Sequence, residues 1–267
     1  MNETLFAFSL TLIAGLATGV GGLVILFSKI TNKKFLSICL SFSAGVMLYI
    51  AFGEIFLEAV ESLEEVHEEM GYLFAVLAFF VGIAIMAAVD KFFPHKDQVT
   101  ELAEKNSQNM SDAELKRTGL MSAVAIAVHN LPEGIITFMA AIHDPAMGIA
   151  IAIAIIIHNI PEAIAMAAPI YYSTGSKAKV LLISLGAGLV QPVGALIAWG
   201  LLQNIFEDVY TVFGIAFALV AGIMVFVAIH QLLPAAQKFG KHHLVMKWLF
   251  AGMAVMAASI VILEFVL

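Results

Sequence analysis

Two short stretches of the chain combine side chains that can bind a metal ion with a spacing that brings them together. His129-Asn130-Leu131-Pro132-Glu133-Gly134 and His158-Asn159-Ile160-Pro161-Glu162-Ala163 share the pattern His-Asn-x-Pro-Glu. Residues i and i+4 lie on one face of a helix, one turn apart, so each copy presents its His and Glu together. Two imidazoles and two carboxylates suit zinc and its divalent neighbours. The two carboxylates also balance the charge of one divalent ion.

Both copies lie within long apolar runs, where ionisable side chains are rare unless they face a cavity and serve a function. A single histidine in such a run is more often a core residue with satisfied hydrogen bonds. The repeated pattern favours a metal site or an ion pathway over that alternative. The proline at i+3 lacks an N–H and clashes with the preceding turn, so we expect each helix to bend there.

The composition indicates the surroundings in which these stretches must fold. Of 267 residues, 61% are hydrophobic and 12% are charged, whereas about a quarter of the residues in soluble domains are charged. We therefore expect a polytopic membrane protein without a nucleic-acid partner. The single cysteine, Cys39, excludes an internal disulfide and a Cys-rich metal cluster, and we expect it in the core. No basic region precedes the first apolar run, so a cleaved signal peptide is not expected.

Eight apolar runs are long enough to cross a hydrocarbon core of about 30 Å. We therefore expect an all-α fold in one transmembrane domain, residues 1–267. The connections are short except for 94–118, within which residues 97–116 mix both charges with Ser, Asn and Gln and favour a mobile linker. The expected spans are 5–28, 36–60, 72–93, 119–142, 146–170, 178–202, 210–234 and 245–267.

The basic residues predict the orientation of these spans. With eight spans, all 13 Lys and Arg residues fall on one side of the membrane, which should be the cytoplasm. The loop 94–118 is then cytoplasmic, and both termini are extracytoplasmic. We expect the protein in the cytoplasmic (inner) membrane. The basic residues are Lys29, Lys33, Lys34, Lys91, Lys96, Lys105, Lys116, Arg117, Lys177, Lys179, Lys238, Lys241 and Lys247.

The opposite side is acidic around the end of the second span. Two interpretations remain open: an electrostatic funnel that concentrates cations at the mouth of a pathway, or an ordinary solvated helix end. The residues concerned are Glu58, Glu61, Glu64, Glu65, His67, Glu68 and Glu69.

An internal repeat indicates how the spans are arranged. Ala44-Gly45-Val46-Met47 in the second span is echoed by Ala221-Gly222-Ile223-Met224 in the seventh. Around the doubled central motif, this predicts a 3+2+3 arrangement of inverted repeats, which in transporters places the substrate site near the midplane. Small residues in the first and sixth spans would allow close packing against the fourth and fifth. Ordinary close packing without any motion is the alternative.

The doubled motif and the Gln191-Pro192 of the sixth span together resemble the ZIP family of divalent-metal transporters. The stretch Asp90-Lys91-Phe92-Phe93-Pro94-His95 is similar to the bacterial GufA/ZupT-like branch of that family. The resemblance covers essentially the whole chain. It implies import of zinc, often with iron, manganese, cobalt, nickel or cadmium, into the cytoplasm. It also implies a transport bundle of spans 1, 4, 5 and 6, a scaffold of spans 2, 3, 7 and 8, and frequent homodimers.

The resemblance also assigns residues. Asn130 and Asn159 match positions that help to hold a second ion in some relatives, but Gln191 stands where two-metal relatives usually have Glu. Because one carboxylate is lost there, we expect one metal per protomer, with Gln191 as a neutral oxygen ligand or hydrogen-bond partner. Glu54, His230 and Gln231 are weaker candidates for contacts along the pathway, with core or interface roles at least as well supported. The expected main metal site is His129, Glu133, His158 and Glu162.

These observations predict a transporter that works by alternating access and not an enzyme, with the divalent metal as its substrate and with no cofactor. Its partners are the metal ion and the lipid bilayer. Uniport and proton-linked transport are equally consistent with the sequence. An alternative from another class is an intramembrane zinc-dependent hydrolase with a zinc-activated water. The absence of HExxH and the lack of a separate general base argue against it. A purely structural metal site fits poorly with proline-broken helices.

Overall fold

A computed structural model of the chain describes residues 2–27, 33–92, 112–204 and 209–266, and the regular secondary structure of these residues is helical. Seven helical segments within them are long and apolar enough to cross a membrane. The remaining predicted span, 119–142, lies inside α6 (Asp112–His143), whose 32 residues exceed the roughly 20 that a crossing needs. The chain is therefore an integral membrane protein with multiple spans, as the composition predicted.

Within the described ranges, the eight predicted spans coincide with eight helical rods, three of which are interrupted. The second rod passes through a π-helical segment, η1, and the seventh through another, η3, whereas the sixth is broken between α8 and α9. In chain order the elements are α1 (Glu3–Phe27), α2 (Lys33–Ile50), η1 (Ala51–Ile55), α3 (Phe56–His67), α4 (Glu69–Phe92), α6, α7 (Pro145–Thr174), α8 (Lys177–Gly188), α9 (Val190–Asn204), α10 (Val209–Phe226), η3 (Val227–Leu232), α11 (Leu233–Phe239) and α12 (His242–Val266).

The two motif helices, α6 and α7, form a tight hairpin because their connection is a single residue. Asp144 is the N-cap of α7, and its side chain accepts a hydrogen bond from the Ala146 N–H at 2.9 Å. Pro145 follows at the first helical position, where its missing N–H has no consequence. At the other end of α7, Gly175 adopts the left-handed conformation (φ 61°) that terminates many helices. The motifs therefore lie on adjacent antiparallel helices.

α6 begins before the expected end of the loop 94–118. Residues 112–118, which the sequence placed in the loop, form the first turns of α6. The charged residues in this stretch did not prevent helix formation, because Lys, Arg and Glu are good helix formers. Residues 93–111, which include most of the predicted mobile linker and His95, lie outside the described residues.

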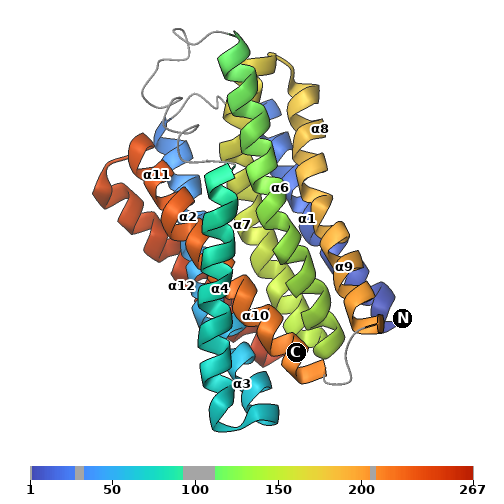
Figure 1. The fold of residues 1–267 in the computed structure, drawn as a ribbon. Coiled ribbons are helices and arrows are strands. Elements are labelled where there is room, and N and C mark those ends of the chain that lie inside the picture. Colours follow the sequence, from blue (N-terminus) through green and yellow to red (C-terminus); the bar gives the residue numbers. More distant parts are fainter. Residues whose placement is uncertain (1, 28–32, 93–111, 205–208, 267) are drawn as a thin grey trace.

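The helices pack in two groups that meet along α2 and α7 (Figure 1). In one group α1, α6, α7 and the α8–α9 rod contact one another; in the other, α2 packs on α12, and α4 packs on α3 and α10. Glycines permit the closest approaches: a Cβ at Gly15 or Gly188 would overlap the backbone of the other residue. The motif helices thus lie inside one group, with α2 of the other group against α7.

Matched glycines also join the helices of the second group. Gly45 of α2 lies against the backbone of α12, and Gly222 of α10 lies against the backbone of α4, so that an added Cβ would overlap a carbonyl oxygen in each case. These are the glycines of the two repeated sequence segments. An inverted repeat would produce such matched contacts, and the 3+2+3 arrangement stays a prediction. In Figure 1, α1 begins and α12 ends toward the lower end, where α3 meets α4.

Candidate metal site

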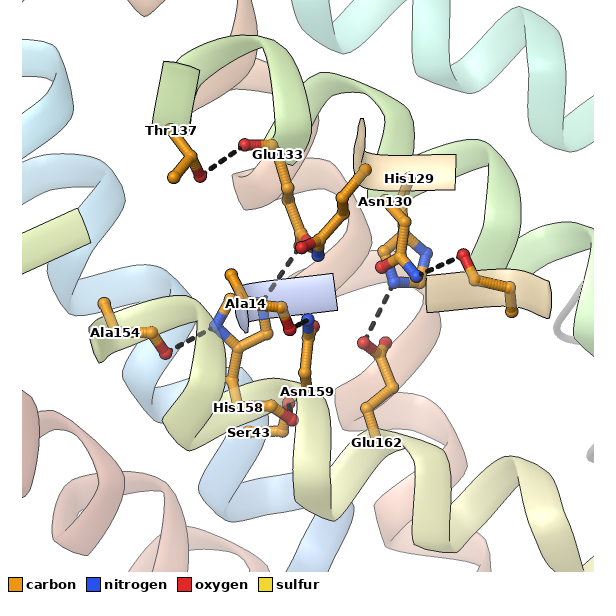
Figure 2. A network of polar contacts seen from close by, with 12 residues as sticks. Ala14, Ser43, His129, Asn130, Glu133, Thr137, Ala154, His158, Asn159 and Glu162 are labelled. Carbon is orange, nitrogen blue, oxygen red and sulfur yellow. Dashed lines mark hydrogen bonds and ion pairs between the residues drawn. The ribbon is translucent and has the colours of Figure 1, made fainter. Parts of the chain in front are cut away.

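The four side chains of the predicted main site lie together between α6 and α7 (Figure 2). All four are buried, with exposed fractions of 0–3% for the residues. Removing imidazoles and carboxylates from water is unfavourable unless they are paired. This cluster therefore needs compensating contacts, which the two helices provide to each other. The four residues are His129, Glu133, His158 and Glu162.

The pairing is crossed between the helices. The distance between His129 Nε2 and Glu162 Oε2 is 2.9 Å, and the distance between His158 Nε2 and Glu133 Oε1 is also 2.9 Å. The i, i+4 spacing correctly placed each His and Glu on a common face, yet each hydrogen-bonds the other helix. Antiparallel neighbours at matching depth make this exchange possible, because the His of one helix lies level with the Glu of the other.

The contact at the second ring nitrogen of His158 implies that His158 and Glu133 share a proton. His158 Nδ1 lies 3.0 Å from the carbonyl oxygen of Ala154, which can only accept, so Nδ1 carries a hydrogen. A neutral imidazole has one N–H, and therefore the hydrogen bond between Nε2 and Glu133 requires an additional proton in the pair. A metal ion that binds both groups must replace this proton.

Gln191 reaches the site from α9, as the sequence predicted. Its Nε2 donates to Glu133 Oε2 at 2.8 Å, so both carboxylate oxygens of Glu133 accept hydrogen bonds. Gln191 is fully buried, and its Oε1 has no hydrogen-bond partner among the described residues. The side chain thus serves as a hydrogen-bond partner of Glu133, and it leaves a neutral oxygen in the buried region.

The two motif asparagines bind the helices that flank the hairpin. Asn130 Nδ2 donates to the Ala187 carbonyl of α8 at 2.9 Å, and Asn159 Nδ2 donates to the Ala14 carbonyl of α1 at 3.2 Å. Within the described part of the chain, neither Oδ1 has a hydrogen-bond partner. Buried amide oxygens without partners are uncommon in proteins. Together with Gln191 Oε1 they provide oxygen atoms that a cation could satisfy.

The two His–Glu pairs do not form a metal-binding geometry as they stand. Among the residues that the structure describes, no three His, Cys, Asp or Glu side chains are arranged to hold a metal ion. Zinc at about 2.0–2.2 Å from N and O ligands separates tetrahedral ligands by roughly 3.3 Å. The 2.9 Å pairs would each widen by a few tenths of an ångström to admit an ion between them.

Proline affects the three site helices differently. α6 continues through Pro132, and α7 continues through Pro161. The sixth rod, by contrast, stops at Gly188 and resumes at Val190. Asn130 hydrogen-bonds the Ala187 carbonyl, one residue before the end of α8. Sequence reasoning located the special residues of this rod but did not predict the break.

The weaker candidates of the seventh rod lie in η3, away from the main site. Gln231 Nε2 donates to Asp90 Oδ1 of α4 at 2.7 Å, while His230 Nδ1 lies 3.6 Å from Asp90 Oδ2. Gln231 is buried, and the His230 ring stacks on Phe226 with its centroid 4.7 Å away. These contacts are compatible with either an interface or a pathway role.

Glu54 of η1 borders a cavity of about 410 Å³ that is lined by residues of α3, α7 and α12. Two further carboxylates, Glu58 and Asp144, line the same cavity. Glu58 Oε1 lies 3.4 Å from Nε2 of His143, the last residue of α6. An acidic cavity beside the hairpin tip is compatible with the funnel interpretation of the acidic end. The remaining lining residues are Ala146, Met147, Ala150, Ile260 and Leu263.

Sequence reasoning did not identify a polar residue of α2 that lies next to the site. Ser43 of α2 is fully buried, and its hydroxyl donates to the His158 carbonyl oxygen at 3.3 Å. The available signal was a serine in the middle of an otherwise apolar span. Without knowledge of which helix packs on α2, that signal does not specify a partner.

The fold defines an integral membrane protein with polar, ionisable groups enclosed by its spans. The family model described as "ZIP Zinc transporter" matches residues 2–116 and 94–259, which together cover most of the chain. The chain belongs to the ZIP zinc transporter family. This is a family of transporters and not of enzymes, so the hydrolase alternative is excluded.

Bacterial relatives match over nearly the full length. The chain is 47% identical over 267 residues to the protein named "Zinc transporter ZupT" of Chlorobaculum parvum, with 98% of each chain covered. Proteins of the same name from Chlorobium chlorochromatii and Lysinibacillus sphaericus are each 49% identical, with 98% of this chain and 98% and 99% of theirs covered.

Proposed function

We propose that the protein imports zinc across the cytoplasmic membrane into the cytoplasm through the His129/Glu133/His158/Glu162 site. The observation that carries this proposal is the pair of crossed His–Glu contacts buried within the spans. Family membership and the names of the relatives, which state zinc as their substrate, support the same assignment. Ionisable side chains at this depth are expected to serve transport.

Ligand exchange is the chemical step. Zinc loses its water and gains two imidazole nitrogens and carboxylate oxygens, while both His–Glu hydrogen bonds open and the additional proton of the His158–Glu133 pair is released. Two carboxylates neutralise the divalent charge, which offsets the penalty of moving the ion away from water. The amide oxygens of Asn130, Asn159 and Gln191 are buried and have no hydrogen-bond partner among the described residues, so they are further candidate ligands.

We expect each protomer to bind one zinc ion. Gln191 donates a hydrogen bond to Glu133 and supplies no third negative charge. A second divalent ion sharing the same two carboxylates would leave a net positive charge in a low-dielectric region, which is strongly disfavoured.

Transport requires that the site open to each side in turn. The proposed moving part is the group of α1, α6, α7 and α8–α9, and the proposed scaffold is the group of α2–α3, α4, α10–α11 and α12. With both termini extracytoplasmic, as the basic residues indicate, the two charges of zinc move inward with the membrane potential. That movement is favourable by roughly 4.6 kcal/mol per 100 mV, at about 2.3 kcal/mol per charge.

Other divalent metals are also proposed substrates, because the ligand set binds several ions in a fixed chemical order of affinity. Iron, manganese, cobalt, nickel and cadmium are the candidates. Uptake competition with this panel of metals, at two pH values, would establish preference and would distinguish uniport from proton-linked transport.

Zinc uptake into proteoliposomes tests the assignment. The double variant Glu133→Gln with His158→Ala removes one ligand from each motif helix, and we expect its uptake to fall to the level of empty vesicles. The matched control is Glu3→Gln with His242→Ala, which changes one exposed Glu and one exposed His far from the site. Undiminished flux in the site variant would exclude these residues as the transport site.

A further inference from the structure

α2 and α7 pack against each other and form the main contact, here called the seam, between the two helix groups. The inner part of this seam is apolar: Cys39 of α2 belongs to one buried cluster with Ala163, Ile164 and Ala167 of α7. Ser43 lies four residues after Cys39, on the same face of α2 and one turn further along. Its hydroxyl donates to the His158 carbonyl oxygen at 3.3 Å.

The hydroxyl of Ser43 differs from the other buried serines of α2 in its choice of partner. Ser41 donates to the Ser37 carbonyl of its own helix at 2.6 Å, the usual i−4 contact of serine in a helix. Ser37 donates to the Ala236 carbonyl of α11, within the same helix group. Ser43 alone of these three donates to a metal-site residue in the other group.

His158 is consequently fixed from three directions. Its main chain accepts from Ser43, its Nδ1 donates to Ala154 of its own helix, and its Nε2 contacts Glu133 of α6. Because a residue of α2 binds the His158 carbonyl, this hydrogen bond fixes the position of His158 along the axis of α2. Changing this height requires the hydrogen bond to break.

We propose that Ser43 is a positioning residue that holds α7 in register with α2 while the metal-site side chains are enclosed, through its hydrogen bond to the His158 carbonyl. This inference rests on the proposed function, in which the group containing α7 moves past α2. Sliding by even one residue, about 1.5 Å, takes the carbonyl out of reach. The hydrogen bond therefore stabilises the enclosed arrangement relative to those in which the seam has shifted.

The alkylation rate of the Cys39 thiol can measure how often α2 and α7 separate, so no engineered cysteine is needed. It is the only cysteine of the chain and is 7% exposed beneath α7. Reaction of its thiol with N-ethylmaleimide requires the seam to open, so the alkylation rate measures how often α7 leaves α2. The measurement needs the full-length protein in vesicles and no metal.

The experiment compares wild type with S43A, S43T and S41A. Alanine is at least as good a helix former as serine, so S43A removes the hydroxyl and leaves α2 helical. We expect Cys39 in S43A to react about fivefold faster, which corresponds to a lost hydrogen bond of about 1 kcal/mol. S43T keeps a hydroxyl and should react at close to the wild-type rate. S41A, which changes a contact inside α2, should also leave the rate unchanged.

Two outcomes would overturn the proposal: an S43A rate equal to that of wild type, or an acceleration as large in S43T or S41A. Zinc uptake, measured in parallel, separates this result from the proposed function. Absence of zinc flux in the wild-type protein would remove the transport assignment, whereas the alkylation rates test the register contact independently.

Discussion

The site has two halves, one built on α6 with α8–α9 and the other on α7 with α1, and their backbone contacts match closely. In the first half Asn130 donates to the Ala187 carbonyl, and in the second half Asn159 donates to the Ala14 carbonyl. Each motif thus binds its neighbour with the same amide group. The match between the two halves therefore extends to the neighbouring helix as well as the motif.

The close packing of the two halves matches as well. Gly194 of α9 lies against the Leu131 carbonyl, two residues after His129, and Gly21 of α1 lies against the Ile160 carbonyl, two residues after His158. A Cβ at either glycine would overlap that oxygen. Both flanking helices therefore approach the motif helices at the same position.

The halves differ four residues beyond the anchoring carbonyls. Gln191 follows Ala187 and donates to Glu133, whereas Thr18 follows Ala14, and its buried hydroxyl has no hydrogen-bond partner among the described residues. The usual i−4 acceptor of Thr18 is the Ala14 carbonyl, which accepts from Asn159. The backbone contacts of the two halves match, but the polar residue at this position does not.

The largest effect should come from removing the carboxylate of either half. Because both charges are needed to neutralise a divalent ion away from water, E133Q and E162Q should each lower zinc uptake by about 100-fold, or about 3 kcal/mol. Initial uptake rates in proteoliposomes provide the measurement, with E3Q as an exposed control. If one variant transported normally, the two halves would not share one ion.

A smaller and more specific change is expected at the residue that makes the halves differ. Q191E adds a third carboxylate beside Glu133, so we expect the zinc content at saturation to rise from one to two ions per protomer. Elemental analysis of the purified protein measures this ratio. Two ions already bound to the wild-type protein would contradict the charge argument for Gln191.

The hydrogen bonds of Asn130 and Asn159 should contribute similar amounts to the free energy of unfolding. N130A and N159A each leave a buried carbonyl without its amide donor, which should lower the free energy of unfolding by about 1–3 kcal/mol. Thermal unfolding in detergent compares the two variants directly. A large cost for one variant and none for the other would show that the matched contacts are not equivalent.

The smallest effect is expected at Thr18. Because its hydroxyl has no partner among the described residues, T18A should change the free energy of unfolding by less than about 0.5 kcal/mol. The same unfolding experiment tests it, with N159A as the reference. A loss as large as that of N159A would indicate that the Thr18 hydroxyl binds a group of its own.

Much of the fold could be predicted from the sequence because membrane spans follow from length and hydropathy alone. The span 146–170 corresponds to α7 (Pro145–Thr174), and 245–267 corresponds to α12 (His242–Val266). The far end of the loop 94–118 was wrong, since α6 begins at Asp112. Charged residues that end a membrane span do not end a helix, so hydropathy could not locate that boundary.

The sequence could also predict that His129, Glu133, His158 and Glu162 lie together, but not which of them form hydrogen bonds with each other. The i, i+4 spacing placed His129 and Glu133 on one face, yet His129 contacts Glu162 of α7. Partner choice depends on the relative height of two helices, which no spacing within one helix encodes. Ser43 was missed for the same reason, because its partner is a main-chain carbonyl on another helix.

The most direct test of the central claim is an anomalous-scattering map at the zinc edge of the protein crystallised with zinc. The account predicts one peak per protomer between α6 and α7, about 2.0–2.2 Å from the Nε2 atoms of His129 and His158 and from oxygens of Glu133 and Glu162. A map with no peak at these four side chains, and with zinc bound elsewhere along the spans, would contradict it.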